Sequence, residues 1–373
     1  MRSRLVTRAA GPRAFGPGAD VGHSRRFPAS QELRVQPELD YPFPAAPGFG
    51  EVAAIDNTLR WIRLPLPYAL DHINLWLIAD GDGWTLVDTG IATDIARGMW
   101  EEIFARGLEG RPIHRLIVTH FHPDHCGLAG WLVERLGIEL WMTRSEWLFG
   151  RMMGLDEPGA SAPTAHFYRR AGVDCAGLER LRKVDGRAWS PLPNSHRRLR
   201  DGDTIAIGDH DWKIIVGSGH SPEHACLHCA DLGIIIGGDH LLARITPNIG
   251  VYVSEPEADP LDEYLGSFAK FHHLPPDTLV LPSHLLPYRG LGRRLAALTH
   301  HHRERLAVLR AACARPQTAA ELVPAMFDRS LDSMNLYLAI GETLSHLNYL
   351  RGRGLVVRES GSDGIDRYRL SGS

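Results

Sequence analysis

Three histidines and an aspartate lie within six consecutive residues of this chain, in the stretch VTHFHPDHCG. They are His120, His122, Asp124 and His125. Imidazole nitrogens and carboxylate oxygens are ligands for divalent metal ions, whereas four crowded polar side chains are hard to satisfy in an apolar core. Alternation along an extended segment places His120 and His122 on one side, and the chain must turn after Pro123. The stretch therefore predicts a metal site, with two neighbouring ions if other segments supply further ligands.

Three later segments each offer one more ligand, directly after an apolar run of strand character. The first is His220 in GSGHSPEH, the second is Asp239 in GGDH, and the third is His284 in LPSH. Binding and catalytic residues are commonly found in loops positioned by a rigid scaffold. We therefore expect these three residues to complete the metal site that the first cluster begins.

The segments between the candidate ligands alternate between strand and helix character. Apolar and β-branched runs predict strands at 59–65, 74–79, 84–88, 114–119, 204–207, 212–216, 225–229, 233–236 and 278–281. Apolar residues at helical spacing predict helices at 94–105, 127–136 and 261–271. Strand-rich blocks alternating with helices indicate an α/β architecture.

The composition is that of an ordinary globular protein. The 373 residues are 44% hydrophobic and 23% charged, with a formal net charge of −3. This charge gives no general attraction to nucleic acid or anionic membranes, and no apolar run approaches the ~20 residues of a membrane span. Five cysteines, an odd number, indicate free thiols in a reducing compartment. We therefore expect a soluble, cytoplasmic protein.

Changes in composition divide the chain into three parts. Residues 1–50 are rich in Gly, Pro and Arg without periodicity, which indicates a disordered tail. Residues 51–290 form the predicted catalytic domain, in which 145–200 are a mostly helical insertion over the metal site. Residues 291–373 show three helical patterns and then a hairpin, which is typical of a winged helix. Thr318 and Glu321 have the spacing of a capping box that opens the second helix.

The ordered set of candidate ligands resembles the metallo-β-lactamase superfamily, whose signature is HxHxDH followed by a later His, an Asp and a final His. The resemblance covers roughly residues 55–290 and implies an αββα sandwich. The C-terminal winged helix resembles, less closely, the subgroup that contains the β-lactamase-like protein 2 ribonucleases. In one departure, the final histidine stands in Pro-Ser-His-Leu, where the family often has Gly-His-Gly, so the local turn should differ.

The resemblance also implies a role for each matching residue. One metal would be held by His120, His122 and His220. A second would be held by Asp124, His125 and His284, with Asp239 bridging both. Asp124 would orient the nucleophile and accept its proton, and Asp88, in the stretch DTG, would support the metal loop from behind. Two zinc ions are expected, and iron or manganese also suit such ligands. Two such ions lower the pKa of a bound water from 15.7 toward ~7, which makes hydroxide available at neutral pH.

Several activities of this superfamily fit the sequence unequally. True β-lactamases generally lack the bridging aspartate, and flavo-diiron oxygen reductases have Glu at the position of His122. The favoured activity is hydrolysis of a small-molecule thioester, ester or lactone, similar to that of hydroxyacylglutathione hydrolases. The alternative is an endoribonuclease of the β-lactamase-like protein 2 type. A mononuclear iron persulfide dioxygenase is a third hypothesis, and the winged-helix tail counts against it.

The charge of the C-terminal module bears on the nuclease alternative. Residues 318–373 carry six Arg against seven Asp or Glu, whereas nucleic-acid binding should show as a basic surface. Nucleic acid is therefore not the favoured partner, although the preceding helical stretch 291–317 is basic. We expect the module to pack on the catalytic domain or to form a homodimer.

Other polar residues are weaker candidates. His224 and His240 are interpreted as residues behind the site or on the surface, and the CxxC pair Cys226 and Cys229 as ordinary thiols. Tyr168, Arg169 and Arg170, in the insertion, either meet an anionic substrate or form a solvated helix face.

Overall fold

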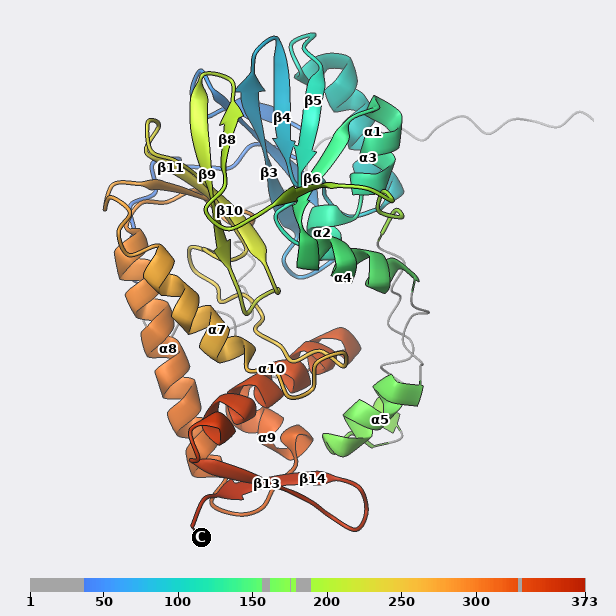
Figure 1. Cartoon of the computed structure of the whole chain (residues 1–373), viewed down its shortest axis with the longest axis vertical. Coiled ribbons are helices and arrows are strands. Elements are labelled where there is room, and N and C mark those ends of the chain that lie inside the picture. Colours follow the sequence, from blue (N-terminus) through green and yellow to red (C-terminus); the bar gives the residue numbers. More distant parts are fainter. Residues whose placement is uncertain (1–36, 156–161, 175, 179–188, 328–330, 373) are drawn as a thin grey trace, which may run out of the picture.

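Two β-sheets packed face to face form the centre of the computed structural model. The structure describes residues 37–372 except 156–161, 175, 179–188 and 328–330. In this part of the chain, helices cover the outer faces of both sheets, and a helical module lies beyond one end of the sandwich (Figure 1). The αββα sandwich predicted from the sequence is thereby confirmed. Among the described residues, no helix is long and apolar enough to cross a membrane.

The seven-stranded sheet follows the order of the chain. Its strands are β1 (Val52–Ala54), β2 (Leu59–Pro65), β3 (His72–Asp80), β4 (Gly83–Val87), β5 (Ile113–Ile117), β6 (Glu139–Thr143) and β7 (Arg197–Leu199). Strands β1 to β4 pair antiparallel and β4 to β7 pair parallel. Strand β3 is buried on both faces, because Ile73 and Leu75 pack toward the outer helices while Trp76 and Ile78 pack toward the other sheet.

The second sheet has five strands in the order β12-β11-β10-β9-β8. They are β8 (Thr204–Ile207), β9 (His210–Gly217), β10 (His224–Cys229), β11 (Ile234–Gly238) and β12 (Leu279–Pro282). Only the β11–β12 pair is parallel within this sheet. The space between the sheets is filled by large apolar side chains, among them Trp61, Trp76 and Trp212. These buried side chains fix how the strand ends of the two sheets meet.

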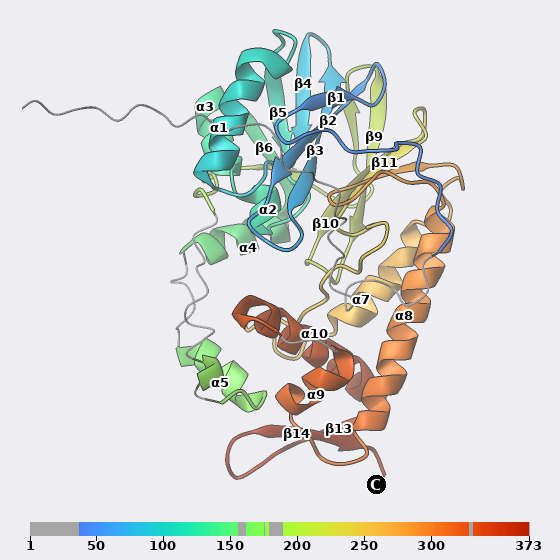
Figure 2. The same cartoon turned by 180° about the vertical axis from the view of Figure 1, so that it is seen from behind.

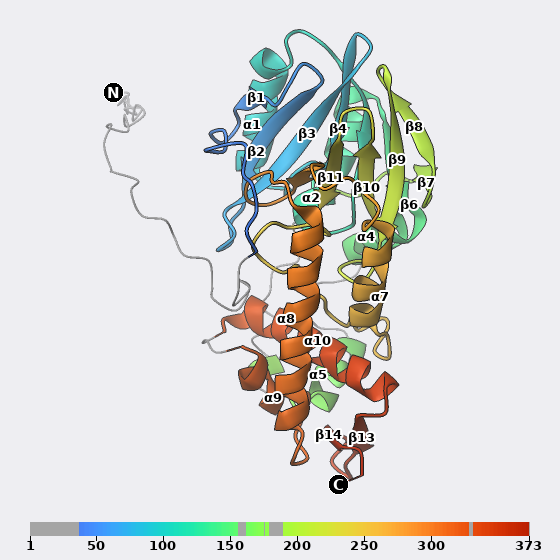
Figure 3. The same ribbon diagram turned by 90° about the vertical axis from the view of Figure 1, so that its left-hand side faces the viewer.

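The outer helices cover the two sheets separately. The helices α1 (Asp94–Glu102) and α3 (Ala129–Leu136) lie on the seven-stranded sheet, with the π-helical turn η1 (Ile103–Gly107) after α1. On the five-stranded sheet lie α7 (Pro260–Ser267), the 3-10 turn η2 (Phe268–Lys270) and the first half of α8 (Leu291–Ala312). Helix α8 then runs on from the sandwich into the C-terminal module (Figure 3).

The C-terminal module consists of the elements that the sequence predicts, in the predicted order. After α8 come α9 (Ala319–Met326), α10 (Ser333–Gly352) and the hairpin β13 (Val356–Ser360) and β14 (Asp366–Leu370). The capping box at the start of α9 is confirmed, because Glu321 N donates to Thr318 Oγ1 and Thr318 N donates to Glu321 Oε2. Apolar residues of α8, α9 and α10 share one continuous core with the outer face of the five-stranded sheet. The C-terminal module therefore packs directly against the sandwich (Figure 2).

The prediction of a mostly helical insertion at 145–200 is only partly correct. Helices α4 (Arg144–Leu155) and α5 (Ala162–Arg170) are present, but β7 at Arg197–Leu199 joins the seven-stranded sheet as an edge strand. Strand β6 was also not predicted. The three residues of β7 are too few to show a clear alternation of apolar and polar residues. Helix α5 lies against the C-terminal module, where Arg170 Nη2 is 2.7 Å from Asp366 Oδ2 and Ala320 N donates to Ala171 O.

The prediction of a disordered tail over residues 1–50 is wrong for residues 37–50. Residues 37–50 are part of the described structure, and Asp40 pairs with Arg289 through two backbone hydrogen bonds of 2.8 and 3.3 Å. Leu39 and Tyr41 pack against the core next to the five-stranded sheet. This order comes from contacts with residues about 250 positions away, which leave no local pattern in the sequence. The rest of the predicted tail, 1–36, lies outside the described residues.

Candidate metal centre

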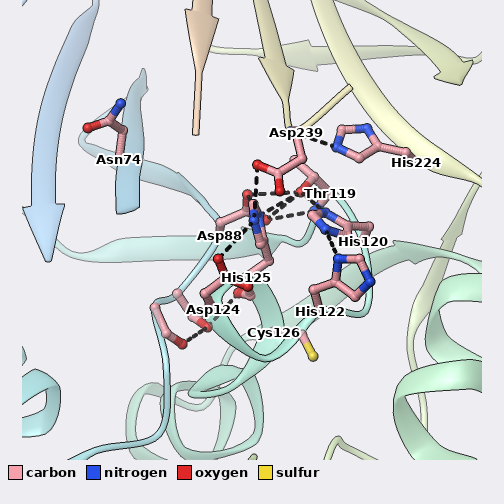
Figure 4. Close-up of polar contacts among 12 residues, drawn as sticks. Asn74, Asp88, Thr119, His120, His122, Asp124, His125, Cys126, His224 and Asp239 are labelled. Atoms are coloured by element: carbon pink, nitrogen blue, oxygen red, sulfur yellow. Dashed lines mark hydrogen bonds and ion pairs between the residues drawn. The ribbon is translucent and has the colours of Figure 1, made fainter. Parts of the chain in front are cut away.

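The seven predicted ligands converge where strands of both sheets end. From the seven-stranded sheet, β5 leads through Thr119 to His120 and His122. Pro123 then occupies the first turn of the short helix α2 (Pro123–Cys126), which carries Asp124 and His125. From the five-stranded sheet, β9 leads to His220, β11 to Asp239 and β12 to His284. Figure 4 shows several of these side chains turned toward one another.

The side chains form two groups that could each hold a cation. The first group is His120, His122, His220 and Asp239, and the second is Asp124, His125 and His284. Within each group the nitrogen and oxygen atoms on offer lie within 4.8 Å of one another. The structure therefore brings together all seven residues that the sequence singled out, in the two sets that the resemblance implies. Clusters of this kind are typical of metal-dependent enzymes of the superfamily that they resemble.

Asp239 lies between the two groups. Its Oδ2 is 3.4 Å from His220 Nε2, and its Oδ1 is 3.4 Å from His125 Nε2 and 3.2 Å from His284 Nε2. One carboxylate thus presents a different oxygen to each group, which is the arrangement of a bridging ligand. Among the described residues, the buried atoms His125 Nε2 and Asp239 Oδ1 make no hydrogen bond. Buried polar atoms rarely stay unpaired, so this donor set fits a pair of bound cations.

Asp88 orients His125 from the end of β4. The Nδ1–H of His125 donates to Asp88 Oδ2 at 2.8 Å, which turns Nε2 toward the centre of the site. The other carboxylate oxygen accepts from Thr119 N at 2.7 Å, and the Thr119 hydroxyl donates to both oxygens (Figure 4). Asp88 thereby ties the end of β4 to the segment that carries the histidine cluster. This is the supporting position that the resemblance implies.

In three other candidate ligand histidines, the ring nitrogen directed away from the site contacts a group that sequence reasoning missed. His220 Nδ1–H donates to Asn248 O at 2.8 Å, and His284 Nδ1–H donates to His72 O at 2.7 Å. His122 Nε2 lies 2.8 Å from the hydroxyl of Tyr252. Such partners fix the tautomer and the ring orientation of a metal-binding histidine. Two of these partners are backbone carbonyls, which no side-chain motif could have revealed.

A buried carboxylate connects the two ligand-bearing loops. Glu146 on α4 accepts a hydrogen bond from Phe121 N at 2.9 Å and another from Glu223 N at 2.6 Å. Phe121 stands between two candidate ligands of the first loop, and Glu223 follows the loop of His220. Burial raises the pKa of Glu146 to about 7. Sequence reasoning missed this residue, because its partners are backbone amides of distant segments.

Most of the weaker candidates make structural contacts and are not among the candidate metal ligands. His224 is buried and its Nε2 accepts a hydrogen bond from Asp239 N at 3.1 Å (Figure 4), while His240 Nε2 pairs with Ser267 Oγ at 2.9 Å. Cys226 and Cys229 are free thiols buried on β10. On α5, Arg170 pairs with Asp366 and Tyr168 is buried beside Tyr337. Cys175 lies outside the described residues.

The electrostatics divide the histidines into two kinds. Burial, reinforced by the neighbouring His220, lowers the pKa of His122 to about 3, and burial also lowers that of His120. Burial acts the same way on His284, but the carboxylates of Asp239 and Asp124 outweigh it and raise its pKa to about 10. The same carboxylates, with Asp88, raise the pKa of His125. In the metal-free protein the two imidazoles beside the carboxylates therefore hold protons at neutral pH.

Metal binding should consequently release protons. A metal coordinates the neutral imidazole, so at pH 7 it must displace a proton from His284 and another from His125. Protons and metal compete for the same imidazole nitrogens. Affinity for zinc should therefore rise as the pH increases toward about 10, the pKa of His284. Titration calorimetry in buffers of different ionisation enthalpy counts the released protons. We expect His284→Ala to release fewer protons than the wild type, and an equal number would contradict this assignment.

Comparisons with known proteins agree with this geometry. The family model described as "Metallo-beta-lactamase superfamily" matches residues 69–284. A second model, "Metallo-beta-lactamase-like, C-terminal domain", matches residues 306–371. The chain therefore belongs to the metallo-beta-lactamase superfamily, and it is a metallo-hydrolase of that superfamily.

Solved structures resemble the chain over most of its length. The crystal structure of a beta-lactamase domain protein from Burkholderia ambifaria is 45% identical and covers 89% of this chain and 98% of its own, with a TM-score of 0.84. A metallo-beta-lactamase family protein from Thermus thermophilus is 30% identical over 85% of this chain and 100% of its own, with a TM-score of 0.72. The match therefore includes the C-terminal module as well as the sandwich.

Curated relatives carry more specific names. The "Probable metallo-hydrolase YqjP" of Bacillus subtilis is 27% identical over 319 residues, which span 79% of this chain and 93% of that protein. A "Hydroxyacylglutathione hydrolase" of Rhizobium etli is 31% identical over 115 residues, which span 31% of this chain and 41% of that protein. The second match thus spans less than half of either protein.

Proposed function

We propose that the protein is a dinuclear zinc hydrolase that cleaves a small-molecule thioester, ester or lactone. The position of Asp239 carries this proposal, because its two carboxylate oxygens face two separate groups of ligand atoms. A single metal would need only one of these groups. Two bound metals would supply an acidified water at neutral pH and would polarise the substrate oxygen.

The remaining steps fall to side chains of the chain itself. Asp124 Oδ2 lies 3.4 Å from His284 Nε2, and the Asp124 side chain is 17% exposed while the histidines of its group are buried. It is therefore placed on the open side of the group, where it would orient the attacking water and accept its proton. Asp88, Asn248 and His72 would hold the imidazoles in register while charge develops at the substrate.

Two observations support a small molecule as the substrate. The partial match to hydroxyacylglutathione hydrolases supports a thioester. The second concerns α10, the third helix of the module, which would read a nucleic acid if the module acted as a winged helix. This helix is already engaged, because Gly341 O accepts from Val251 N and Asn348 Nδ2 donates to Pro256 O and Ala258 O. These contacts count against the endoribonuclease alternative.

Metal content and substrate choice test the proposal together. We would purify the protein without added metal, measure metal per chain by mass spectrometry, and assay a thioester, a lactone and single-stranded RNA, with His122→Ala as the control. The expected result is about two zinc ions per chain and turnover of the thioester or the lactone that the variant lacks. One iron per chain would overturn the dinuclear site, and cleavage of RNA alone would overturn the substrate class.

A further inference from the structure

A long segment without helix or strand, residues 246–259, lies between the candidate metal centre and α10. Connections of this length without secondary structure are uncommon in compact domains and often serve a function. The segment is nevertheless fixed, because Ile249 is fully buried and Val251 is 4% exposed, both in the core shared with the C-terminal module. The segment contacts the candidate metal ligands on one side and α10 on the other.

On one side, the 246–259 segment contacts two candidate ligands of the first group. The carbonyl oxygen of Asn248 accepts the hydrogen bond from His220 Nδ1 at 2.8 Å. The hydroxyl of Tyr252 lies 2.8 Å from His122 Nε2. The ring of Tyr252 also packs edge-on against Phe121, the residue between His120 and His122. The orientation of two imidazoles therefore depends on the path of this segment.

On its other side, the segment is bonded to α10. Asn248 Nδ2 donates to Glu342 Oε2 at 3.0 Å and to Leu338 O at 3.3 Å, and Val251 N donates to Gly341 O at 3.0 Å. The approach at Gly341 is close, since a Cβ there would lie 3.3 Å from Val251 O. Asn248 thus contacts both His220 and α10. Its backbone carbonyl accepts the hydrogen bond from His220, and its side chain is hydrogen-bonded to α10.

We propose that the C-terminal module is part of the metal centre, and that Asn248 is the positioning residue through which α10 orients His220. This inference rests on the proposed metal-binding role of the first group. Groups that hold a metal-ligating histidine from behind typically change metal affinity by 10- to 100-fold when they are removed. Loss of the bonds from Asn248 to α10 would free the carbonyl that fixes the tautomer and ring angle of His220.

The chain offers a matched control at the same interface. Asn348, on α10, also donates two side-chain hydrogen bonds across it, to Pro256 O at 3.2 Å and to Ala258 O at 2.8 Å. These carbonyls belong to the far end of the 246–259 segment, past the residues that contact the imidazoles. Asn248→Ala and Asn348→Ala therefore remove the same number of bonds between the same two elements. Of these two residues, only Asn248 also contacts a candidate ligand, His220.

The experiment measures zinc affinity of the metal-free proteins by competition with a chelator, and the visible spectrum of their cobalt forms. We expect Asn248→Ala to weaken zinc binding by about 10- to 100-fold and to shift the cobalt spectrum. Asn348→Ala should lower the melting temperature to a similar degree but leave affinity and spectrum close to the wild type. Glu342→Gln keeps an acceptor oxygen for Asn248 and should retain affinity, whereas Glu342→Ala should lose part of it.

The outcomes separate the inference from the proposed function. Equal zinc affinity in Asn248→Ala and Asn348→Ala would overturn the inference while leaving the metal site intact. If Asn248→Ala does not fold, the Glu342→Gln and Glu342→Ala pair decides, and equal affinity in that pair would also overturn it. Failure of the wild-type protein itself to bind zinc would instead overturn the proposed function.

Discussion

Replacement of Asp239 by asparagine should remove one metal from the protein and lower kcat/KM by at least about 1,000-fold, or about 4 kcal/mol of transition-state stabilisation. Asparagine keeps the shape of the side chain but has one acceptor oxygen and no charge. Both Asp239 oxygens face ligand atoms, at 3.2 to 3.4 Å from His284, His125 and His220, so the amide NH2 would have to point at one of the two groups. The variant would also lack the negative charge that would offset the two proposed metal ions.

A second, largely buried carboxylate serves as the control for this prediction. Asp80, at the opposite end of β3 from His72, accepts hydrogen bonds from Thr85, Arg115 and the backbone of Gly208. Asp80→Asn should lower the melting temperature but leave the metal content and kcat/KM near the wild-type values. Metal analysis and steady-state kinetics on both variants check the prediction. Two retained metals and an unchanged kcat/KM in Asp239→Asn would remove Asp239 from the site.

The candidate ligands could be predicted because their residue types are informative. Histidine and aspartate packed at fixed spacing, or standing directly after an apolar strand, have few structural explanations, and the structure brings all seven together. The role of Asp88 and the division of the ligands into two groups came from the resemblance to the metallo-β-lactamase superfamily. Their distances from one another were not available from the sequence.

The groups that hold the ligands could not be predicted in this way. Asn248 and His72 accept hydrogen bonds from the imidazoles through their backbone carbonyls, which no side-chain motif marks, and Glu146 binds backbone amides of two separate loops. Such contacts depend on the path of the chain in space. The sequence therefore identifies the atoms that could bind metal but not the second layer of contacts that orients them.

The same distinction holds for the fold. Strand β3 and its neighbours were predicted because long runs of apolar residues mark strands buried on both faces. Strand β7 was missed because three residues, Arg197–Leu199, carry no period, and they form a strand only by pairing with β6. Residues 37–50 were assigned to a tail for a similar reason, since their order comes from the pairing of Asp40 with Arg289.

The turn that presents His284 shows how the departure from Gly-His-Gly is accommodated. Leu285 has a φ of 69°, in the left-handed region, which costs about 1 to 2 kcal/mol for a residue other than glycine. Hydrogen bonds offset this cost: Leu285 N donates to His72 Nε2 at 2.8 Å, and Asn74 Nδ2 donates to Leu285 O at 2.8 Å and to Pro282 O at 3.0 Å. The turn therefore delivers His284 Nε2 to 3.2 Å from Asp239 Oδ1.

Asn74→Ala should consequently be among the most destabilising single substitutions in the sandwich. The Asn74 side chain is fully buried, and its Oδ1 also accepts from Trp61 Nε1 at 2.9 Å. Alanine would therefore leave a buried donor, the buried carbonyl of Pro282 and the partly buried carbonyl of Leu285 without their partner. We expect the free energy of unfolding of the metal-free protein to fall by about 3 to 5 kcal/mol, as measured by urea denaturation. Zinc affinity should fall as well, because the turn that carries His284 would lose two of its bonds.

Thr85→Val separates these two effects. The buried Thr85 hydroxyl donates one hydrogen bond, to Asp80 Oδ2 at 2.7 Å, far along β3 from the His284 turn. Its removal should cost about 1 kcal/mol of unfolding free energy and leave zinc affinity unchanged. An Asn74→Ala protein that unfolded at the wild-type urea concentration, or that bound zinc as tightly as Thr85→Val, would show that the turn stands without Asn74. Reduced stability together with reduced zinc affinity would show that the buried amide both stabilises the sandwich and holds His284 in place.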